Sequence, residues 1–298
     1  MIYDTIIIGL GCAGMSASIY AKRSNLNVLV IEKGMPGGLI NQTSLVDNYL
    51  GFQNITGPEL VKQMNDHFKS YDIPVIKETV ESITLDSDLR IIKTNKNTYK
   101  TKSVIISTGR RNKRLPLENI DIYEGKGISY CALCDGNFFK GKDVAIVGAG
   151  NSAFEEGLYL ANICRKIYIL VRGLEIRASK LLQSQLQNTK NVELIYNAEV
   201  KELKGKNTLE NLVLSNDQTI KVSGLFVYIG FEAAADFANH LNITNTYGYI
   251  NVNEDMETSV EGIFACGDIV NKKIYQITNA VSEGAICGIN VEKYRNKE

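Results

Sequence analysis

One pattern occurs twice in this sequence: an apolar strand, a turn with glycines at fixed spacing, and a helical segment. The first copy predicts a strand at Thr5–Ile8 followed by the turn G-L-G-C-A-G at Gly9–Gly14. The second predicts a strand at Asp143–Val147 followed by the turn G-A-G-N-S-A at Gly148–Ala153. In each copy a further apolar strand follows the helix, as in a β-α-β unit of a parallel sheet. The repeat predicts an α/β fold with two Rossmann-like, three-layer nucleotide-binding domains.

The length and the order of these segments predict that one domain is inserted in the other. Single hydrophobic cores stop growing at roughly 250 residues, and this chain has 298. Near the C-terminus a strand closing on Gly267-Asp268, with a helix after it, returns the chain to the first unit. Polar or small-residue segments at Arg110–Pro116 and Gly230–Asn239 are typical of hinges. We therefore expect two domains of the nucleotide-binding type, one formed by residues 1–113 and 242–298 and a central one at 117–238.

Four shorter stretches alternate apolar and polar residues, as half-buried strands do. They lie at residues 82–85, 89–94, 193–197 and 211–214. We expect them to form small antiparallel sheets that pack on the parallel ones.

Composition excludes several classes of partner and place. The 33 basic and 33 acidic residues balance, so the chain has no net field to attract nucleic acid or an anionic membrane. No apolar run reaches 18 residues, and the N-terminus has no basic leader segment, which predicts a cytoplasmic protein. Four of the six cysteines are isolated, which does not suit a secreted disulfide framework.

The first glycine turn has the context of a dinucleotide site. Gly9, Gly11 and Gly14 would let the backbone approach a pyrophosphate at the helix N-terminus, and Glu32, which ends the next strand, can accept hydrogen bonds from a ribose. Further contacts to the same dinucleotide are expected from Gly37, Gly38, Gly267 and Asp268. The alternative is a tight turn that binds nothing.

The second turn, with Gly148 and Gly150, has a different next strand. That strand ends at Arg172, with no acidic residue to accept from a 2′-hydroxyl, and Arg177 follows. Arginines there favour a 2′-phosphate, so this site would take NADPH better than NADH. A retained fold whose nucleotide site has decayed explains the turn equally well, because glycines preserve the fold whether or not a ligand binds.

The segment C-A-L-C-D carries the most reactive pattern in the chain. Cys131 and Cys134 form a C-x-x-C motif, and Asp135 directly after it is a candidate proton carrier. A zinc site would need two further ligands, and the chain has no second C-x-x-C and only two histidines, so we expect no metal. Two buried structural cysteines are the remaining alternative. A redox-active pair is the favoured interpretation.

These motifs resemble one family nearly from end to end: the low-molecular-weight flavoprotein thioredoxin reductases. The resemblance rests on the first glycine turn, on G-I-S-Y-C-A-L-C-D-G at 127–136, on E-E-G-L-Y-L after the second turn, and on R-A-S-K and T-S-V-E-G-I-F-A-C-G-D further along. It implies FAD, a homodimer, thioredoxin as partner, and a central domain that rotates about its hinges. It also implies that Cys134 faces the flavin, that Cys131 attacks the partner's disulfide, and that Asp135 moves protons.

The departures from this family concern the electron donor. Where NADPH-using members carry a His-Arg-Arg run, this chain has V-R-G-L-E-I-R. Gln276 is expected to contact FAD, and the residue before it is Tyr275, at a position where the family usually has an arginine. These differences resemble the branch that takes electrons from ferredoxin. The leading hypothesis is therefore an enzyme passing electrons from reduced ferredoxin through FAD to the cysteine pair and on to thioredoxin. The same reaction with NADPH, a dithiol oxidase and a non-catalytic redox-sensing flavoprotein are the alternatives.

Overall fold

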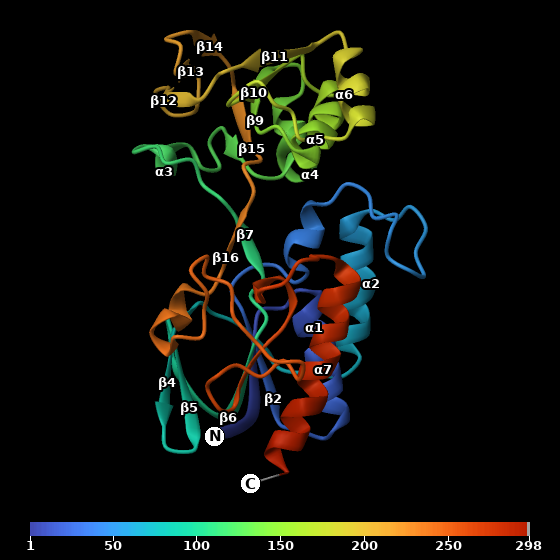
Figure 1. The fold of residues 1–298 in the computed structure, drawn as a ribbon, viewed down its shortest axis with the longest axis vertical. Helices are drawn as coiled ribbons and strands as arrows, with labels where there is room; N and C mark the ends of the chain where they lie inside the picture. The colour runs from blue at the N-terminus through green and yellow to red at the C-terminus, as the bar shows by residue number, and fades with distance from the viewer. Residues whose placement is uncertain (297–298) are drawn as a thin grey trace. The chain divides into compact units, whose positions relative to one another are not determined.

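The computed structural model describes residues 1–296 and divides the chain into two compact units (Figure 1). Unit 1 contains residues 1–111 and those from 232 onward, and unit 2 contains residues 112–231. Unit 2 is thus an insertion in unit 1, as the return of the chain predicts. The boundary after unit 2 lies earlier than the expected 238, because Ala233, Ala235 and Ala238 are buried in a core cluster of unit 1. No helix among residues 1–296 is long and apolar enough to cross a membrane.

Unit 1 contains one large sheet with helices on it. Its elements are β1 (Ile2–Ile8), α1 (Cys12–Arg23), β2 (Val28–Glu32), η1 (Gly38–Gln42), α2 (Gly57–Lys69), β3 (Val75–Lys77), β4 (Val80–Asp86), β5 (Leu89–Thr94), β6 (Thr98–Ile106), β7 (Arg110–Asn112), β16 (Phe231–Ala233), η3 (Asp236–Leu241), β17 (Ile263–Ala265), η4 (Gly267–Ile269) and α7 (Ile277–Arg295), of which β7 and β16 pair where the chain crosses between the units.

The sheet of unit 1 has the order β3-β2-β1-β6-β5-β4, and β17 pairs with β6. The pairs of β1 with β2 and β6, of β2 with β3, and of β17 with β6 are parallel. The pairs β4–β5 and β5–β6 are antiparallel. Parallel strands all end at the same edge of a sheet, so the segments that follow β1, β2 and β17 meet there.

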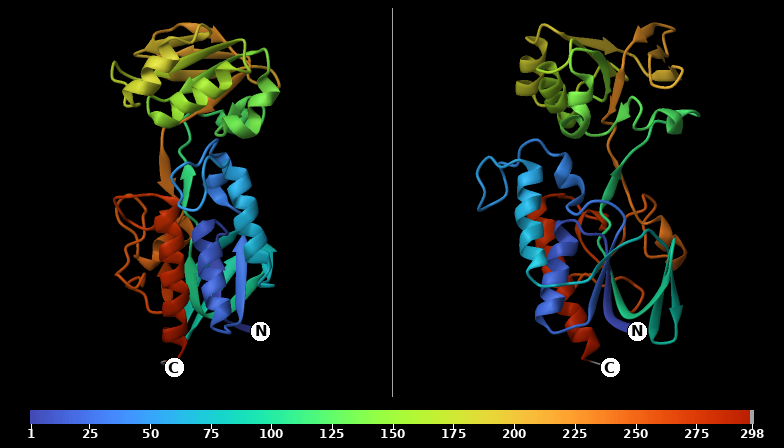
Figure 2. Two further views of the ribbon diagram at one scale, coloured as in Figure 1. Left: turned by 90° about the vertical axis from the view of Figure 1, so that its right-hand side faces the viewer. Right: turned by 180° about the vertical axis from the view of Figure 1, so that it is seen from behind.

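The side chains of β1 explain why this sheet is covered on both faces. Ile6 and Ile8 belong to one buried cluster, whereas Ile7 belongs to the other, which includes residues of α1 and α7. Successive strand residues point to opposite faces, so an unbroken apolar run such as this one needs a layer on each side. Figures 1 and 2 show α1, α2 and α7 together on one face of the sheet.

Unit 2 repeats the same plan on a smaller scale. Its elements are α3 (Ile120–Tyr123), β8 (Ile128–Ser129), α4 (Ala132–Asp135), η2 (Gly136–Phe139), β9 (Asp143–Val147), α5 (Asn151–Ala161), β10 (Lys166–Val171), α6 (Lys180–Gln187), β11 (Val192–Tyr196), β12 (Val200–Lys204), β13 (Asn211–Leu214), β14 (Thr219–Lys221) and β15 (Gly224–Val227). One sheet is parallel, in the order β11-β10-β9-β15-β8, and β12-β13-β14 form a separate antiparallel sheet.

The expected small antiparallel sheets are only partly present. Residues 211–214 do lie in a separate antiparallel sheet, as β13. Residues 82–85 and 89–94 pair antiparallel, but they extend the large sheet of unit 1. For residues 193–197 the expectation was wrong, because they belong to β11, a parallel edge strand. An edge strand alternates polar and apolar residues in either kind of sheet, so its pattern does not reveal its direction.

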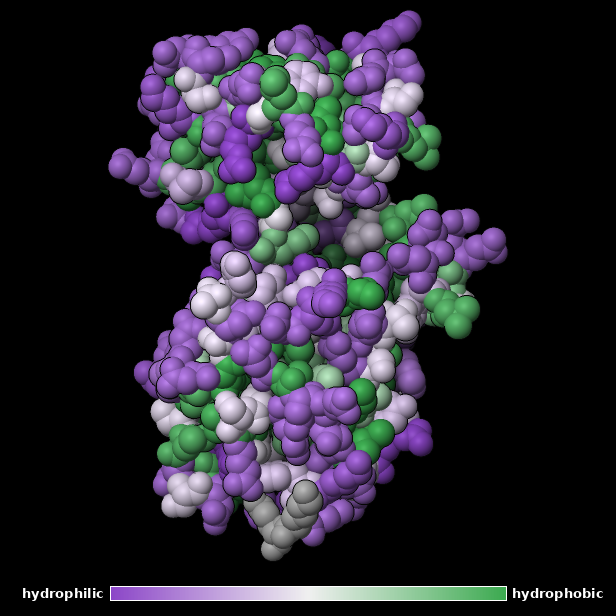
Figure 3. Space-filling model, in the orientation of Figure 1, coloured by the Kyte–Doolittle hydropathy of each residue, from purple (hydrophilic) through white to green (hydrophobic). Residues whose placement is uncertain are grey.

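The surface agrees with the balanced composition. On the face of each unit seen in Figure 3, hydrophilic residues dominate and hydrophobic residues are scattered between them. Scattered apolar side chains are normal on the surface of a folded protein.

Helices α1 and α7 pack so closely that glycine is required between them. A Cβ atom on Gly284 would lie 2.2 Å from the backbone oxygen of Ala13, and one on Gly288 would lie 2.6 Å from the Cβ of Tyr20. Backbone at this distance cannot yield as a flexible side chain can. The tight contact fixes α1, and with it the glycine turn that precedes α1.

We expect Gly284→Ala to destabilise the protein, although the same change in an open helix stabilises it by about 1 kcal/mol. The clash with Ala13 should reverse the sign and cost about 1–3 kcal/mol, the range for an overpacked core. Urea unfolding measures the difference. Ser282→Ala, at an exposed position of the same helix, is the control and should leave stability unchanged or slightly raised. A Gly284→Ala variant as stable as that control would contradict the close packing.

Candidate functional site

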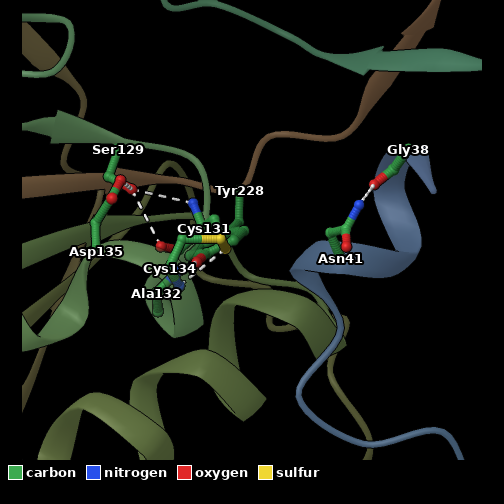
Figure 4. The surroundings of a disulfide bond; sticks show 8 residues. All are labelled: Gly38, Asn41, Ser129, Cys131, Ala132, Cys134, Asp135 and Tyr228. Atoms are coloured by element: carbon green, nitrogen blue, oxygen red, sulfur yellow. Dashed lines mark hydrogen bonds between the residues drawn. A yellow bond between two sulfur atoms is a disulfide. The ribbon is translucent and has the colours of Figure 1, made fainter. Parts of the chain in front are cut away.

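Cys131 and Cys134 are joined in a disulfide, with their Cα atoms 5.3 Å apart (Figure 4). Cys131 has extended backbone and caps the short helix α4, and the backbone N–H of Cys134 donates to its Sγ at 3.1 Å. Cys134 is exposed, whereas Cys131 is only 7% exposed. The turn therefore presents one sulfur to solvent and keeps the other among backbone N–H groups.

Asp135 is tied to this turn through Ser129. The hydroxyl of Ser129 donates to Oδ2 of Asp135 at 2.7 Å, and the Ser129 Oγ accepts from the backbone N–H of Cys131 at 3.1 Å (Figure 4). Ser129 is buried, so the chain of hydrogen bonds is shielded from water. The Asp135 carboxylate is thus held beside the C-x-x-C turn, one hydrogen-bonded residue away from the Cys131 backbone, where it is a candidate to exchange protons with the reduced pair.

A tyrosine holds the other side of the turn. The backbone N–H of Ala132 donates to the hydroxyl oxygen of Tyr228 at 2.9 Å (Figure 4). Burial raises the pKa of Tyr228 above its ordinary value, and the charges of Glu156 and Asp135 raise the pKa further. Tyr228 follows β15 directly, so the carboxyl end of a central strand supports the C-x-x-C turn.

The four other cysteines, Cys12, Cys164, Cys266 and Cys287, are free thiols. Burial raises the pKa of Cys12 to about 12 and that of Cys164 to about 11, and it also raises the pKa of Cys287. A thiol attacks only as the thiolate, so these three groups are unsuited to redox attack. Reactive sulfur is concentrated at the C-x-x-C turn.

Each glycine of the first turn has a separate physical reason. Gly9 has φ of +99°, and a Cβ on it would lie 2.6 Å from the backbone oxygen of Ser107. A Cβ on Gly14 would lie 2.0 Å from the oxygen of Gly9, so the helix must begin without one. A Cβ on Gly11 would have no atom within 4 Å, and Gly11 caps α1 without a side-chain hydrogen bond. The turn thus exposes backbone N–H groups at a helix N-terminus.

Glu32, Gly37 and Gly38 gather beside this turn. The Glu32 carboxylate accepts from the backbone N–H of Leu10 at 2.6 Å and of Gly34 at 2.7 Å. Gly37 donates from its backbone to the oxygen of Leu10 at 2.7 Å, and a Cβ on Gly38 would lie 3.8 Å from the Cα of Gly11. Glu32 therefore holds the turn in place, and a carboxylate can accept further bonds from a ribose.

The C-terminal segment completes the same edge of the sheet. Gly267 lies against the first turn of α1, since a Cβ on it would come within 2.7 Å of the Cβ of Ala13. Asp268 accepts from Arg110 through Nε at 3.1 Å and Nη2 at 2.8 Å, and the Arg110 guanidinium lies 4.1 Å from the ring centre of Tyr275. Gln276 caps α7 and accepts from the Asn48 side chain at 3.3 Å. All nine residues expected to contact FAD thus lie in segments at this edge.

The second glycine turn keeps the geometry of the first. Gly148 has φ of +148°, and a Cβ on it would lie 2.5 Å from the backbone oxygen of Tyr228. Gly150 has nothing within 4 Å and caps α5 without a side-chain hydrogen bond, as Gly11 caps α1. The structural requirement and the open approach are therefore both retained in unit 2.

Arg172 and Arg177 lie beside this second turn. Arg172 follows the end of β10, and the backbone N–H of Arg177 donates to the oxygen of Ala149 at 2.8 Å. Both side chains are exposed. They are placed where cations could reach a phosphate bound at the N-terminus of α5.

Together the fold and the site define a class: a two-domain, nucleotide-dependent disulfide oxidoreductase. A family model described as pyridine nucleotide-disulphide oxidoreductase matches residues 3–284. The chain belongs to this family.

Similar proteins narrow the class further. A thioredoxin reductase of Bacillus subtilis is 40% identical, covering 98% of this chain and 95% of its own. The structure of a thioredoxin reductase of Lactococcus lactis, 33% identical, matches with a TM-score of 0.89 over 99% of this chain and 100% of its own. A ferredoxin-flavin thioredoxin reductase of Clostridium acetobutylicum, 30% identical, matches with a TM-score of 0.57 over 100% and 99%. The protein is a flavin disulfide oxidoreductase, and its cofactor is FAD.

The residues of unit 1 fit FAD. The space beside Gly11, the uncapped N-terminus of α1 and the Glu32 carboxylate provide the groups that a pyrophosphate and a ribose require. FAD contains both a pyrophosphate and a ribose, so it matches these groups.

Sequence reasoning missed four residues of the site: Ser129, Tyr228, Glu156 and Arg110. Ser129 lies within the G-I-S-Y-C segment, so its closeness to the cysteines was a usable signal. Tyr228 is 94 residues from Cys134 in sequence, and only the pairing of β15 beside β9 and β8 brings it there. Arg110 looked like a hinge residue.

Glu156 gives a prediction for stability against pH. Burial, with a contribution from Glu155, raises the pKa of Glu156 to about 7 from 4.5. Between pH 4.5 and pH 7 the folded state therefore binds a proton that the unfolded state lacks. The contribution of Glu156 to the free energy of unfolding is full below pH 4.5 and is lost as the pH rises through 7.

Replacing Glu156 by Gln removes this loss. Relative to wild type, Glu156→Gln should gain up to about 3 kcal/mol of unfolding free energy between pH 5 and pH 8. Denaturant unfolding at a series of pH values measures it. The exposed neighbour variant Glu155→Gln should change far less. A difference that stays constant with pH would show that Glu156 does not titrate in this range.

Proposed function

We propose that this enzyme reduces the disulfide of thioredoxin through FAD and the Cys131–Cys134 pair. The observation that carries the proposal is the disulfide itself, placed in a unit with nucleotide-binding architecture. In its turn the backbone N–H of Cys131 donates to Ser129, and Ser129 donates to Asp135. The 40% identity to a thioredoxin reductase along 98% of the chain supports thioredoxin as the substrate.

Each residue of the turn has a proposed role. Reduction of the pair leaves a thiol at Cys134 and a thiolate at Cys131, and the Cys131 thiolate attacks the thioredoxin disulfide to form a mixed disulfide. Cys134 then attacks the Cys131 sulfur, which restores the internal disulfide and releases the second thioredoxin sulfur. Asp135, through Ser129, carries to the two leaving thioredoxin sulfurs the proton that Cys134 loses and the proton that entered the site on reduction. Two electrons and two protons pass to thioredoxin in each cycle.

FAD supplies the electrons to the pair when it is bound. Gly9, Gly11 and Gly14 would admit its pyrophosphate at α1, and Glu32 would accept from a ribose. Gly37, Gly38, Gly267, Asp268 and Gln276 would line the same edge. These assignments make unit 1, close to the expected residues 1–113 and 242–298 but resuming at 232, the FAD domain, and they make the inserted unit 2 the one that carries the redox pair.

For the electron donor there are two candidates. The retained geometry of Gly148 and Gly150, with Arg172 and Arg177 exposed beside it, supports NADPH. The missing His-Arg-Arg run supports ferredoxin, as does the similarity to a protein named ferredoxin-flavin thioredoxin reductase. The open second turn is a positive feature of this chain, whereas the missing run is an absence, so we favour NADPH. A homodimer and a cytoplasmic location remain predictions.

Single variants should distinguish the roles of the two cysteines. Cys134→Ser should leave the flavin reducible, stop turnover, and trap thioredoxin as an adduct on Cys131. Cys131→Ser should stop turnover without that adduct. Non-reducing electrophoresis and peptide mass spectrometry identify the adduct.

Cys164→Ala, which removes the other cysteine of unit 2, is the control and should turn over normally. Because Cys134 is the exposed sulfur here, an adduct found only in Cys131→Ser would reverse the two roles. Sustained turnover in wild type also separates a reductase from a redox sensor, which would react once.

The donor is identified by anaerobic reduction of the FAD-loaded enzyme. We expect NADPH to bleach the oxidised flavin absorbance, and we expect Arg172→Ala with Arg177→Ala to weaken NADPH binding by about one to two decades, since each charge-assisted bond is worth about 1.5–3 kcal/mol. Lys190→Ala, an exposed charge after α6, is the control. Bleaching by reduced ferredoxin alone would reject NADPH and leave the second turn as a scaffold.

A further inference from the structure

Glu156 is a buried carboxylate that no step above uses. It is 7% exposed, and its Oε2 is one of three buried side-chain polar atoms among residues 1–296 that have no hydrogen-bond partner. Burying an unpaired carboxylate is costly, and an apolar residue would fill the same place without that cost. The position therefore calls for an explanation.

Its place in the helix makes the choice of residue more unusual. Ala153, Glu156, Gly157 and Leu160 are buried on one face of α5, at the spacing of a core-facing stripe. That face packs on the redox turn: Ala132 is fully buried in the same cluster as Phe154 and Leu160. Glu156 is thus the one charged residue on the face of α5 that supports the C-x-x-C segment.

Tyr228 connects Glu156 to that segment. Its hydroxyl oxygen accepts from the backbone N–H of Ala132, between the two cysteines, at 2.9 Å. It also lies near enough to Glu156 for the Glu156 charge to raise the pKa of its hydroxyl. The bond from Ala132 does not use the Tyr228 proton, so the hydroxyl is free to turn that proton toward Glu156, whose Oε2 has no partner in this structure.

We propose that Glu156 is a positioning residue for the Cys131–Cys134 pair, acting through Tyr228 as the site that takes up a proton when the pair is reduced. This inference rests on the proposed redox role of the pair. Reduction breaks the S–S bond with two electrons and, when one proton reaches the sulfurs, leaves one thiol and one thiolate. The new negative charge draws a second proton from solvent onto Glu156. Reoxidation by a disulfide substrate releases that proton.

The charges around the pair fix the direction of the effect. Glu155 on α5 acts on Glu156, and both Glu156 and Asp135 from α4 act on Tyr228 after β15, which is bonded to the turn. An ionised Glu156 disfavours a thiolate nearby and so raises the thiol pKa. Protonated Glu156 has the charge and shape of glutamine. The two side chains should therefore differ in effect only where Glu156 is ionised.

The test is the pH profile of thiolate reactivity, which does not depend on thioredoxin or on the electron donor. The FAD-loaded enzyme is reduced with dithiothreitol, freed of it anaerobically, and alkylated with iodoacetamide between pH 5.5 and pH 9. At pH 8 we expect Glu156→Gln to react about three- to tenfold faster than wild type, the factor for a thiol pKa lower by about 0.5–1. At pH 5.5 the two rates should coincide.

Two further variants make the result decisive. Glu155→Gln, the same change on the exposed side of the helix, should follow wild type closely. In a Tyr228→Phe background, Glu156→Gln should have no further effect. A rate difference that is the same at every pH would mean that Glu156 only supports the fold, and it would overturn the proposal. Persistence of the full pH-dependent effect without the Tyr228 hydroxyl would overturn the route through Tyr228.

Discussion

The close approach of strand and helix at a glycine turn is the constraint on which the rest of this structure depends. A single Cβ atom on Gly14 would lie 2.0 Å from the oxygen of Gly9, so α1 could not start where it does. Because α1 starts there, it can pack against α7 across Gly284 and Gly288. That packing covers one face of the parallel sheet, whose apolar strands need a layer on both sides. The helix N-terminus that results faces open space at Gly11, which is where a dinucleotide cofactor would be bound.

The same constraint operates in unit 2, with a different outcome. Gly148 and Gly150 reproduce the strained and the open positions of the first turn. What differs is the next strand: β2 ends at Glu32, which accepts from two backbone N–H groups, whereas β10 is followed by Arg172, whose side chain is exposed. The turn geometry alone therefore cannot tell which nucleotide binds. The residue at the end of the second strand carries that information, and its charge is negative in unit 1 (Glu32) and positive in unit 2 (Arg172).

Much of this could be predicted from sequence, because the decisive signals are local. The bounds of β9 and β10 match the apolar runs at 143–147 and 166–171, and the C-x-x-C pair is disulfide-linked as its spacing indicates. Three features depended on tertiary structure instead. Residues 193–197 pair parallel because β10 lies beside them, residues 232–238 join unit 1 because their alanines fill its core, and Tyr228 reaches the disulfide only through the order of the strands. A pattern within one segment cannot predict what another segment places next to it.

Two acidic residues near the glycine turns show how burial and hydrogen bonding divide structural from functional roles. Glu32 uses its carboxylate to hold the turn, with Leu10 and Gly34 donating to it, so its charge is compensated by the fold. Glu156 has no such donors, and burial, with a smaller contribution from Glu155, raises its pKa to about 7. A carboxylate without donors is sensitive to charges that appear near it, which is why we propose that reduction of the Cys131–Cys134 pair is felt at Glu156 through Tyr228 and Ala132.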